Sequence, residues 1–369
     1  MKLVAQTAPY IRKNDSVRRM MVDVIIALMP VTIFAMIQNG WASIYVILIS
    51  LVTMVAIELL SHMFIKWPKD MKFKELFTKE GFTKVKSTYT INNFTAPIVS
   101  ALIYALILPA YCAPYVVFIG AAFGIFVGKM VFGGLGSNIF NPAAVGRIFV
   151  GICFGGQIGD AYQKQQAFID AAAGGTPLAP VKGALGATGG YSLLDLFLGN
   201  IPGCMGEVSK ICILVGAIYL FARHSADLRA ALGFLLSFGV VMLVASISYL
   251  GVDGNANVGE IWLYQMLSGG VLFGAAFMIT DPVTSPISKY GRVLYAAIAG
   301  CITALIRVCG AFPEGVAFSI LIANMLVAPI DYFMRGKPNT YTWKQCLGLG
   351  IGIALVCVIV SASVMGGWF

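Results

Sequence analysis

The stretch WASIYVILISLVTMVAIELLSHMF, residues 41–64, contains a single carboxylate, Glu58, among mostly apolar residues. A helix needs about 20 mostly apolar residues to cross a bilayer, because its backbone polar groups must all be paired in hydrocarbon. The whole chain has the same character: 59% of its 369 residues are hydrophobic, 11% are charged, and the mean hydropathy is +0.86. A soluble domain carries roughly 25% charged residues. The sequence therefore predicts an integral membrane protein.

Ten runs are long and apolar enough to span a membrane: 20–38, 41–64, 93–110, 114–132, 207–222, 229–250, 261–280, 291–311, 315–334 and 345–368. A shorter run, 139–155, contains Asn141-Pro142 and Arg147, and either a half-helix or a full span fits it. The predicted fold class is thus an all-α polytopic membrane protein with about 10–11 transmembrane helices.

The basic residues are distributed unevenly between the two sides of the predicted membrane domain. With all eleven runs taken as crossings and the N-terminus inside, twenty basic residues lie inside, including seven lysines within 66–86 and Lys129. Only three lie outside: Lys164, Lys182 and Lys210. Because an excess of Lys and Arg marks cytoplasmic loops, the N-terminus is predicted to be cytoplasmic. The net charge of 25 − 16 = +9 then reflects topology, and nucleic-acid binding is not predicted.

One stretch, residues 156–204, is rich in Gly, Ala and polar residues and does not resemble a membrane span. A connection this long in a compact domain usually carries function or is disordered. The predicted organisation is a cytoplasmic N-terminal segment, a first half of the membrane domain, an exterior loop and a second half: 1–19, 20–155, 156–204 and 205–369.

The two halves share features that indicate an internal repeat. Asn141-Pro142 and Asp281-Pro282 each follow a Phe-Gly pair at nearly the same spacing, and Gly199–Pro202 with Glu207 is mirrored loosely by Gly310–Glu314. Proline removes a backbone donor and restrains the residue before it, so these sites predict broken helices. Broken helices repeated in two halves are typical of a site near the bilayer midplane. The alternative is ordinary packing kinks.

Ionisable groups inside membrane runs are costly, at about 2.5–3.5 kcal/mol each on insertion scales. Glu207 and Glu314 begin later runs, Asp281 lies at a helix break, and Arg307 is a positive charge within a run. One interpretation is an ion path lined by these groups; the alternative is structural pairing, for example of Arg307 with a carboxylate. The eight cysteines contain no Cys-x-x-Cys pair, so no metal site is predicted. From these residues alone, a permease and a membrane redox subunit both remain open.

The predicted exterior loop contains DAAAGGTPL at 170–178. This stretch resembles the flavin-attachment motif, roughly Asp-Gly-x-Ser/Thr-Gly-Ala-Thr, in which a flavin transferase esterifies FMN to the final threonine. The spacing from Asp170 to Thr176 and the glycine at 174 match the motif. The sequence departs from it at three positions: Ala171, Ala173 and Gly175.

Thr176 is the acceptor that this resemblance implies for a covalent FMN phosphoester. Thr188, in Gly-Ala-Thr at 186–188, reproduces the last three letters better, but the residue six positions before it is Lys182. The predicted FMN site therefore consists of Thr176 and its neighbours: Asp170, Gly174, Gly175 and Pro177.

Four further stretches extend the resemblance over the chain after its first twenty residues: SNIFNPAAVGR (137–147), LFLGNIPGCMGE (196–207), LSGG with ITDPVTSP (267–286) and PEGVAFSILIANMLVAPID (313–331). Together they resemble the RnfD/NqrB family. TDPVTSP and PEGVAF look more like the D subunit of the Rnf complex than the B subunit of the sodium-pumping NADH:quinone reductase, which stays an alternative.

The resemblance implies a subunit of an ion-translocating ferredoxin:NAD oxidoreductase that moves Na+ or H+ across a prokaryotic cell (inner) membrane. It implies covalent FMN, a flavin transferase for maturation, and the A, B, C, E and G subunits of the Rnf complex as partners. In the sodium-pumping relatives the region of the Asn138-x-x-Asn141-Pro142 break holds a non-covalent riboflavin. Asn138 and Asn141 are therefore candidate ligands of a second flavin, although helix capping by asparagine explains them as well.

Overall fold

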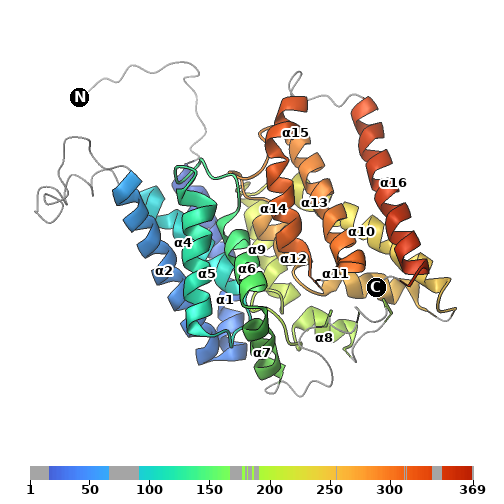
Figure 1. Ribbon diagram of the computed structural model, residues 1–369, viewed down its shortest axis with the longest axis horizontal. Coiled ribbons are helices and arrows are strands. Elements are labelled where there is room, and N and C mark those ends of the chain that lie inside the picture. Colours follow the sequence, from blue (N-terminus) through green and yellow to red (C-terminus); the bar gives the residue numbers. More distant parts are fainter. Residues whose placement is uncertain are drawn as a thin grey trace, which may run out of the picture.

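The computed structural model describes residues 16–65, 91–166, 177–178, 181, 185–186, 191–254, 256–310, 312, 314–334 and 343–367. Five residues of the predicted flavin segment lie outside these described residues: Asp170, Gly174, Gly175, Thr176 and Thr188. Within the described ranges all regular secondary structure is helical (Figure 1).

The first half of the chain contains α1 (Val17–Asn39), α2 (Trp41–Ile65), α4 (Ile91–Leu106), α5 (Pro114–Ile125), the π-helix η2 (Phe126–Met130), α6 (Pro142–Cys153) and α7 (Gly155–Gln166). The second half contains α8 (Leu193–Leu198), α9 (Lys210–Ala222), α10 (Leu228–Leu250), α11 (Val258–Leu267), α12 (Val271–Phe273), the π-helix η4 (Gly274–Met278), α13 (Lys289–Cys309), α14 (Val316–Met325), α15 (Val327–Phe333) and α16 (Trp343–Met365).

The described helices confirm the predicted all-α membrane class. Five of them are long and apolar enough to cross a membrane, and up to eight spans result if each of three bent helix pairs counts as one. The bends are 96° between α6 and α7, 56° between α11 and the α12–η4 segment, and 49° between α14 and α15. Three shorter apolar helices, α4, α5 with η2, and α9, coincide with three further predicted runs. Broken helices are therefore confirmed, but these three bends lie at residues 154, 268–270 and 326 and not at Asn141-Pro142 or Asp281-Pro282.

Polar side chains fix the starts of the helices that follow breaks. Asn141 accepts a hydrogen bond from the backbone N–H of Ala143 and precedes a proline at the first position of α6. Ser209 caps α9 and Ser288 caps α13 in the same way. Such caps satisfy backbone donors that have no partner inside the helix, which matters most where no water is available.

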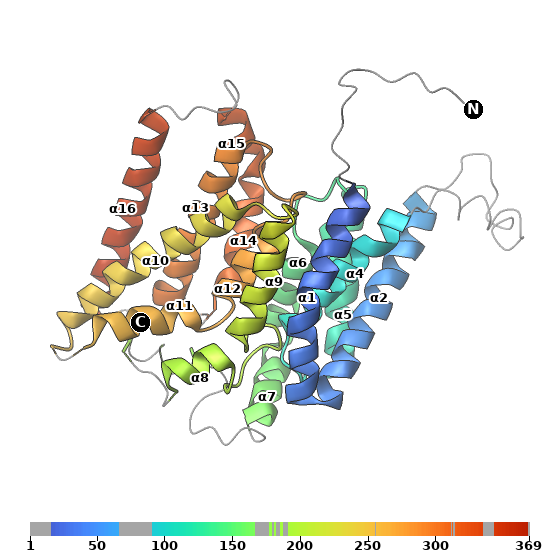
Figure 2. The ribbon, with the colours of Figure 1, turned by 180° about the vertical axis from the view of Figure 1, so that it is seen from behind.

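The two halves of the chain lie side by side (Figures 1 and 2). Helices α1, α2, α4, α5 and α6 pack on one side, and α10, α11, α13, α14 and α16 pack on the other. Contacts between α6 and α14, and between α9 and α1, join them. Small residues permit close approach within each half: a Cβ on Gly146 would lie 2.6 Å from the carbonyl oxygen of Gly120. Close packing of this kind drives helix association in membranes.

The segment predicted as an exterior loop, 156–204, contains two short helices in its described part. Helix α7 buries Ile158, Ala161 and Gln165, and Gln165 donates a hydrogen bond of 3.2 Å to Asn39 at the end of α1. Helix α8 begins with a capping box in which the Ser192 hydroxyl holds the pKa of the exposed Asp195 carboxyl below its usual range. Both helices lie at the end of the bundle opposite the start of α1 (Figure 2).

Candidate functional site

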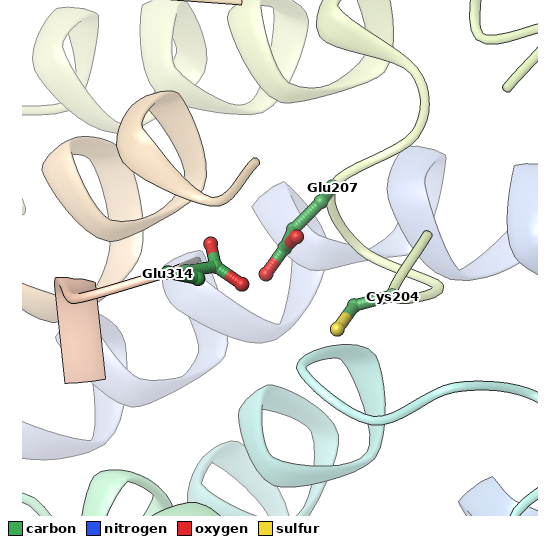
Figure 3. Close-up of side chains that lie close together, drawn as sticks. All are labelled: Cys204, Glu207 and Glu314. Carbon is green, nitrogen blue, oxygen red and sulfur yellow. The ribbon is translucent and has the colours of Figure 1, made fainter. Parts of the chain in front are cut away.

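Two helix breaks, one ending at Glu207 before α9 and the other at Glu314 before α14, meet inside the membrane domain. The two carboxylates point toward one another (Figure 3), and one oxygen of each lies within 4.8 Å of the other and of the Cys204 sulfur. These are the breaks that the sequence repeat relates loosely to each other. The repeat thus places equivalent carboxylates together.

A third break, between α11 and α12, makes room for these carboxylates. Gly269 has a φ of +66°, and the backbone N–H of Gly270 donates a hydrogen bond to Glu314 Oε1. A Cβ on Gly270 would lie 2.6 Å from Glu314 Oε1 and 2.7 Å from Glu207 Oε1. Only glycine, which lacks a Cβ, allows both carboxylates to approach the backbone here.

Three basic side chains surround the carboxylate pair. The Lys210 ammonium is fully buried and donates to the backbone carbonyl of Glu207. Arg307 is 4% exposed, donates to the backbone carbonyl of Gln265 at 2.7 Å, and lies 5.0 Å above the Phe238 ring. The Arg147 Nε donates to the Ile107 carbonyl at 2.9 Å. Lys210, which the sequence predicts on the exterior side, has its side chain buried inside the protein.

A cavity of about 310 Å³ adjoins this cluster. Its wall is mostly apolar, and the charged side chains on it are Glu207, Glu314 and Arg147, as far as the described residues go. Pro177 and Leu178 also line it, and Tyr264 donates a hydrogen bond of 2.8 Å to the Pro177 carbonyl. The residues directly after the predicted FMN acceptor are therefore fixed on the wall of this cavity.

A second, smaller cavity of about 80 Å³ is lined by Asp281, Asn138, Asn141 and Lys129. Asp281 therefore lies on a cavity other than the one that Glu207 and Glu314 line, and its carboxylate accepts hydrogen bonds from the backbone N–H of Val283 and the hydroxyl of Thr284. Asn324 of α14 links the break at Asn141 to the break at Asp281. In the side-chain amide orientation that satisfies its neighbours, its oxygen accepts from the backbone N–H of Asn141 at 3.1 Å and its nitrogen donates to the Thr284 carbonyl at 3.2 Å.

Asn138 and Asn141 make local contacts at this second cavity. Asn138 donates to the Phe140 carbonyl at 3.1 Å, and Asn141 caps α6. Small-molecule sites usually measure at least about 300 Å³. A cavity of about 80 Å³ does not fit the isoalloxazine ring of riboflavin.

Lys129, which the sequence predicts on the cytoplasmic side, is buried in an ion pair. Its ammonium lies 2.6 Å from Glu58 Oε2, and both side chains are only 3% exposed. The pair joins α2 to the π-helix η2, a type of element that occurs frequently at functional sites. Sequence reasoning missed this pair, although a carboxylate and a lysine within predicted spans were visible signals for it.

A comparison with known protein families gives a match over most of the chain. A profile of the NQR2, RnfD, RnfE family matches residues 4–340. The chain belongs to this family. The family predicted from the sequence motifs is thereby confirmed.

Individual relatives match different shares of the chain. It is 31% identical over 343 residues to the D subunit of the Na(+)-translocating ferredoxin:NAD(+) oxidoreductase complex of Acetobacterium woodii, covering 91% of this chain and 95% of that protein. It is 32% identical over 356 residues to the D subunit of an ion-translocating oxidoreductase complex of Stutzerimonas stutzeri, covering 89% and 93%. The B subunit of the Na(+)-translocating NADH-quinone reductase of Chromohalobacter salexigens is 38% identical over 239 residues, covering 64% of this chain and 57% of that protein. The chain thus spans little more than half of this quinone-reductase protein.

Proposed function

We propose that this chain is the D subunit of an ion-translocating ferredoxin:NAD oxidoreductase and carries FMN on Thr176 through a phosphoester. Membership of the family makes the chain a membrane subunit of an ion-translocating oxidoreductase complex. Matches along nearly the whole length of two D-type subunits favour the ferredoxin-linked complex. The partners are then the other subunits of that complex, with a flavin transferase during maturation.

One observation carries the flavin proposal: Pro177 and Leu178, which follow the acceptor threonine, line the cavity beside Glu207 and Glu314. The tyrosine bond to the Pro177 carbonyl holds this wall in place. FMN attached to the neighbouring residue would therefore have a cavity within reach. The attachment motif and the cavity are independent signals for the same segment.

The cavity has the character of a site for a ring-shaped cofactor. Its volume of about 310 Å³ and mostly apolar wall are within the range of small-molecule sites, with a few polar groups to orient the ligand. Phe312 and Phe318, stacked with ring centroids 4.9 Å apart, form part of the wall. These residues fit FMN, with Arg147 and Tyr162 as the polar groups that would orient it. When bound, FMN supplies redox chemistry that no side chain can supply.

The chain's own residues then have separate tasks. The apolar wall excludes water, and the arginine at 147 supplies positive charge. Buried Glu207 and Arg307 form one group of charges with half-buried Glu314, while Asp281 lines the second cavity with the Glu58–Lys129 pair nearby. We propose that the translocated ion, Na+ or H+, passes these carboxylates. Two groups on different cavities would suit a path with an entrance and an exit.

The proposed orientation puts the N-terminus in the cytoplasm and the flavin segment outside a prokaryotic cell membrane. The uneven distribution of Lys and Arg supports it. Helices α7 and α8, which flank the flavin segment, lie at the end of the bundle opposite the start of α1 and the end of α2, as this orientation requires (Figures 1 and 2).

The B subunit of a sodium-pumping NADH:quinone reductase is the second candidate, because identity to such a protein reaches 38%. The purified complex distinguishes the two: ferredoxin-dependent NAD+ reduction supports the first, and NADH-dependent quinone reduction supports the second. The sequence also left a small-solute permease open as a function. Such a protein would have no need of an attached flavin.

The test of the flavin proposal uses two threonine variants of the intact complex. Thr176→Ala should remove the fluorescent flavin band of this subunit on a denaturing gel, whereas Thr188→Ala should keep it. Both variants should retain the folded membrane domain, because neither changes an apolar span. A fluorescent Thr176→Ala subunit, or loss of fluorescence only in Thr188→Ala, would refute the assignment.

A further inference from the structure

Among the described residues, three basic side chains and two carboxylates lie in or beside the larger cavity: Arg147, Lys210, Arg307, Glu207 and Glu314. Lys210 and Arg307 are almost completely buried, and uncompensated charge in such surroundings is costly.

Within the described part of the chain, Arg147 is the basic group that keeps hydrogen-bond donors for an anion. Lys210 donates to a backbone carbonyl, and Arg307 donates to Gln265 and to the Ser268 carbonyl. Arg147 lines the cavity and uses only its Nε, on the Ile107 carbonyl, for a hydrogen bond with the described part of the chain. That bond fixes the guanidinium while leaving its Nη donors available. A guanidinium held in this way suits bidentate binding of an anionic group.

We infer that the cavity is an anion site in which Arg147 binds a negative charge of FMN. The charge is carried either by the phosphodiester at the attachment point, next to Pro177, or by the isoalloxazine ring when it is reduced. The phosphodiester and the reduced ring would both present anionic atoms that accept hydrogen bonds at the same cavity wall, so one guanidinium would bind either of them. This inference rests on the proposed covalent flavin and adds the residue that neutralises it.

The test uses Arg147→Gln and Arg147→Lys in the intact complex. Covalent FMN is measured by fluorescence on a denaturing gel, and its midpoint potential by spectroelectrochemical titration. Arg292→Gln is the matched control, because Arg292 is paired with Asp227 at 3.1 Å and lines neither of these two cavities.

If the phosphodiester is the partner, Arg147→Gln should lower the amount of covalent FMN, because the attached phosphate loses its charge-assisted hydrogen bonds. If the ring is the partner, FMN content should persist while the midpoint potential becomes more negative, because the reduced form loses its counter-charge. In both cases Arg147→Lys, which keeps the charge but not the paired donors, should recover part of the loss, and Arg292→Gln should match the wild type.

Wild-type FMN content and potential in Arg147→Gln would overturn the inference. Equal impairment of Arg147→Lys and Arg147→Gln would also overturn it, because the effect would then come from the lost bond to Ile107 rather than from charge. A wild-type subunit without covalent FMN would instead refute the proposed function, so the two failures are distinguishable.

Discussion

The buried pair of Glu58 and Lys129 gives a prediction about stability that can be worked out from its geometry. The ammonium nitrogen lies 2.6 Å from the carboxylate oxygen, and each side chain is 3% exposed. Attraction at this distance offsets the desolvation of two charges, so the pair as a whole contributes little net stability. Removing one partner strands the other charge, which costs about 3–5 kcal/mol.

Glu58→Gln and Lys129→Met should therefore each destabilise the subunit by about 3–5 kcal/mol, whereas the double variant should recover most of the loss. The assay is thermal unfolding of the purified complex in detergent with a thiol-reactive fluorescent dye. Cys112, Cys204 and Cys301 are buried and react only after unfolding. Each single variant should unfold several degrees below the wild type.

The matched control is the Asp227–Arg292 pair, whose side chains are 20% and 28% exposed. Arg292→Gln should cost about 0–1 kcal/mol, as expected for a solvent-accessible pair. The reasoning is refuted if Glu58→Gln and Lys129→Met unfold like the wild type, or if the loss in the double variant equals the sum of the single losses.

Three further predictions concern the site and its orientation. Gly270→Ala would place a methyl group 2.6 Å from Glu314 Oε1, so it should cost about 1–3 kcal/mol in the same unfolding assay; unchanged unfolding would contradict the close approach. Asp281→Asn and Glu314→Gln should lower ion uptake into proteoliposomes more than they lower flavin content. Wild-type uptake and electron transfer in both would make these carboxylates structural. In whole cells an impermeant maleimide should label a cysteine introduced at Gln163 but not at Lys74, and the reverse pattern would overturn the orientation.

Hydropathy predicted most of the fold because a bilayer imposes one strong rule, an apolar helix of sufficient length. It failed to predict α7, because that helix is polar and begins with two glycines. One face of α7 shows the spacing i, i+3, i+4 and i+7 of an amphipathic helix: Ile158, Ala161, half-buried Tyr162 and Gln165. That signal was present in the sequence.

The site was predictable only in part. Proline and glycine mark the breaks locally, so Glu207 and Glu314 could be identified as candidates. Which breaks meet is a property of tertiary packing, and it put Asp281 on another cavity. Lys129 was counted with the cytoplasmic residues, but it is buried against Glu58, which is 71 positions away in the sequence. Each residue is visible in the sequence as a charge within an apolar run, whereas their pairing depends on tertiary packing.

The most direct test of the central claim is mass spectrometry of the wild-type protein after digestion with trypsin. Cleavage after Lys164, Lys182 and Lys210 separates the two candidate threonines, and the peptide 165–182 contains Thr176 as its only hydroxyl-bearing residue. We expect this peptide to carry the mass of FMN less one water. FMN on the peptide 183–210, which contains Thr188, or on neither peptide, would contradict the proposed attachment.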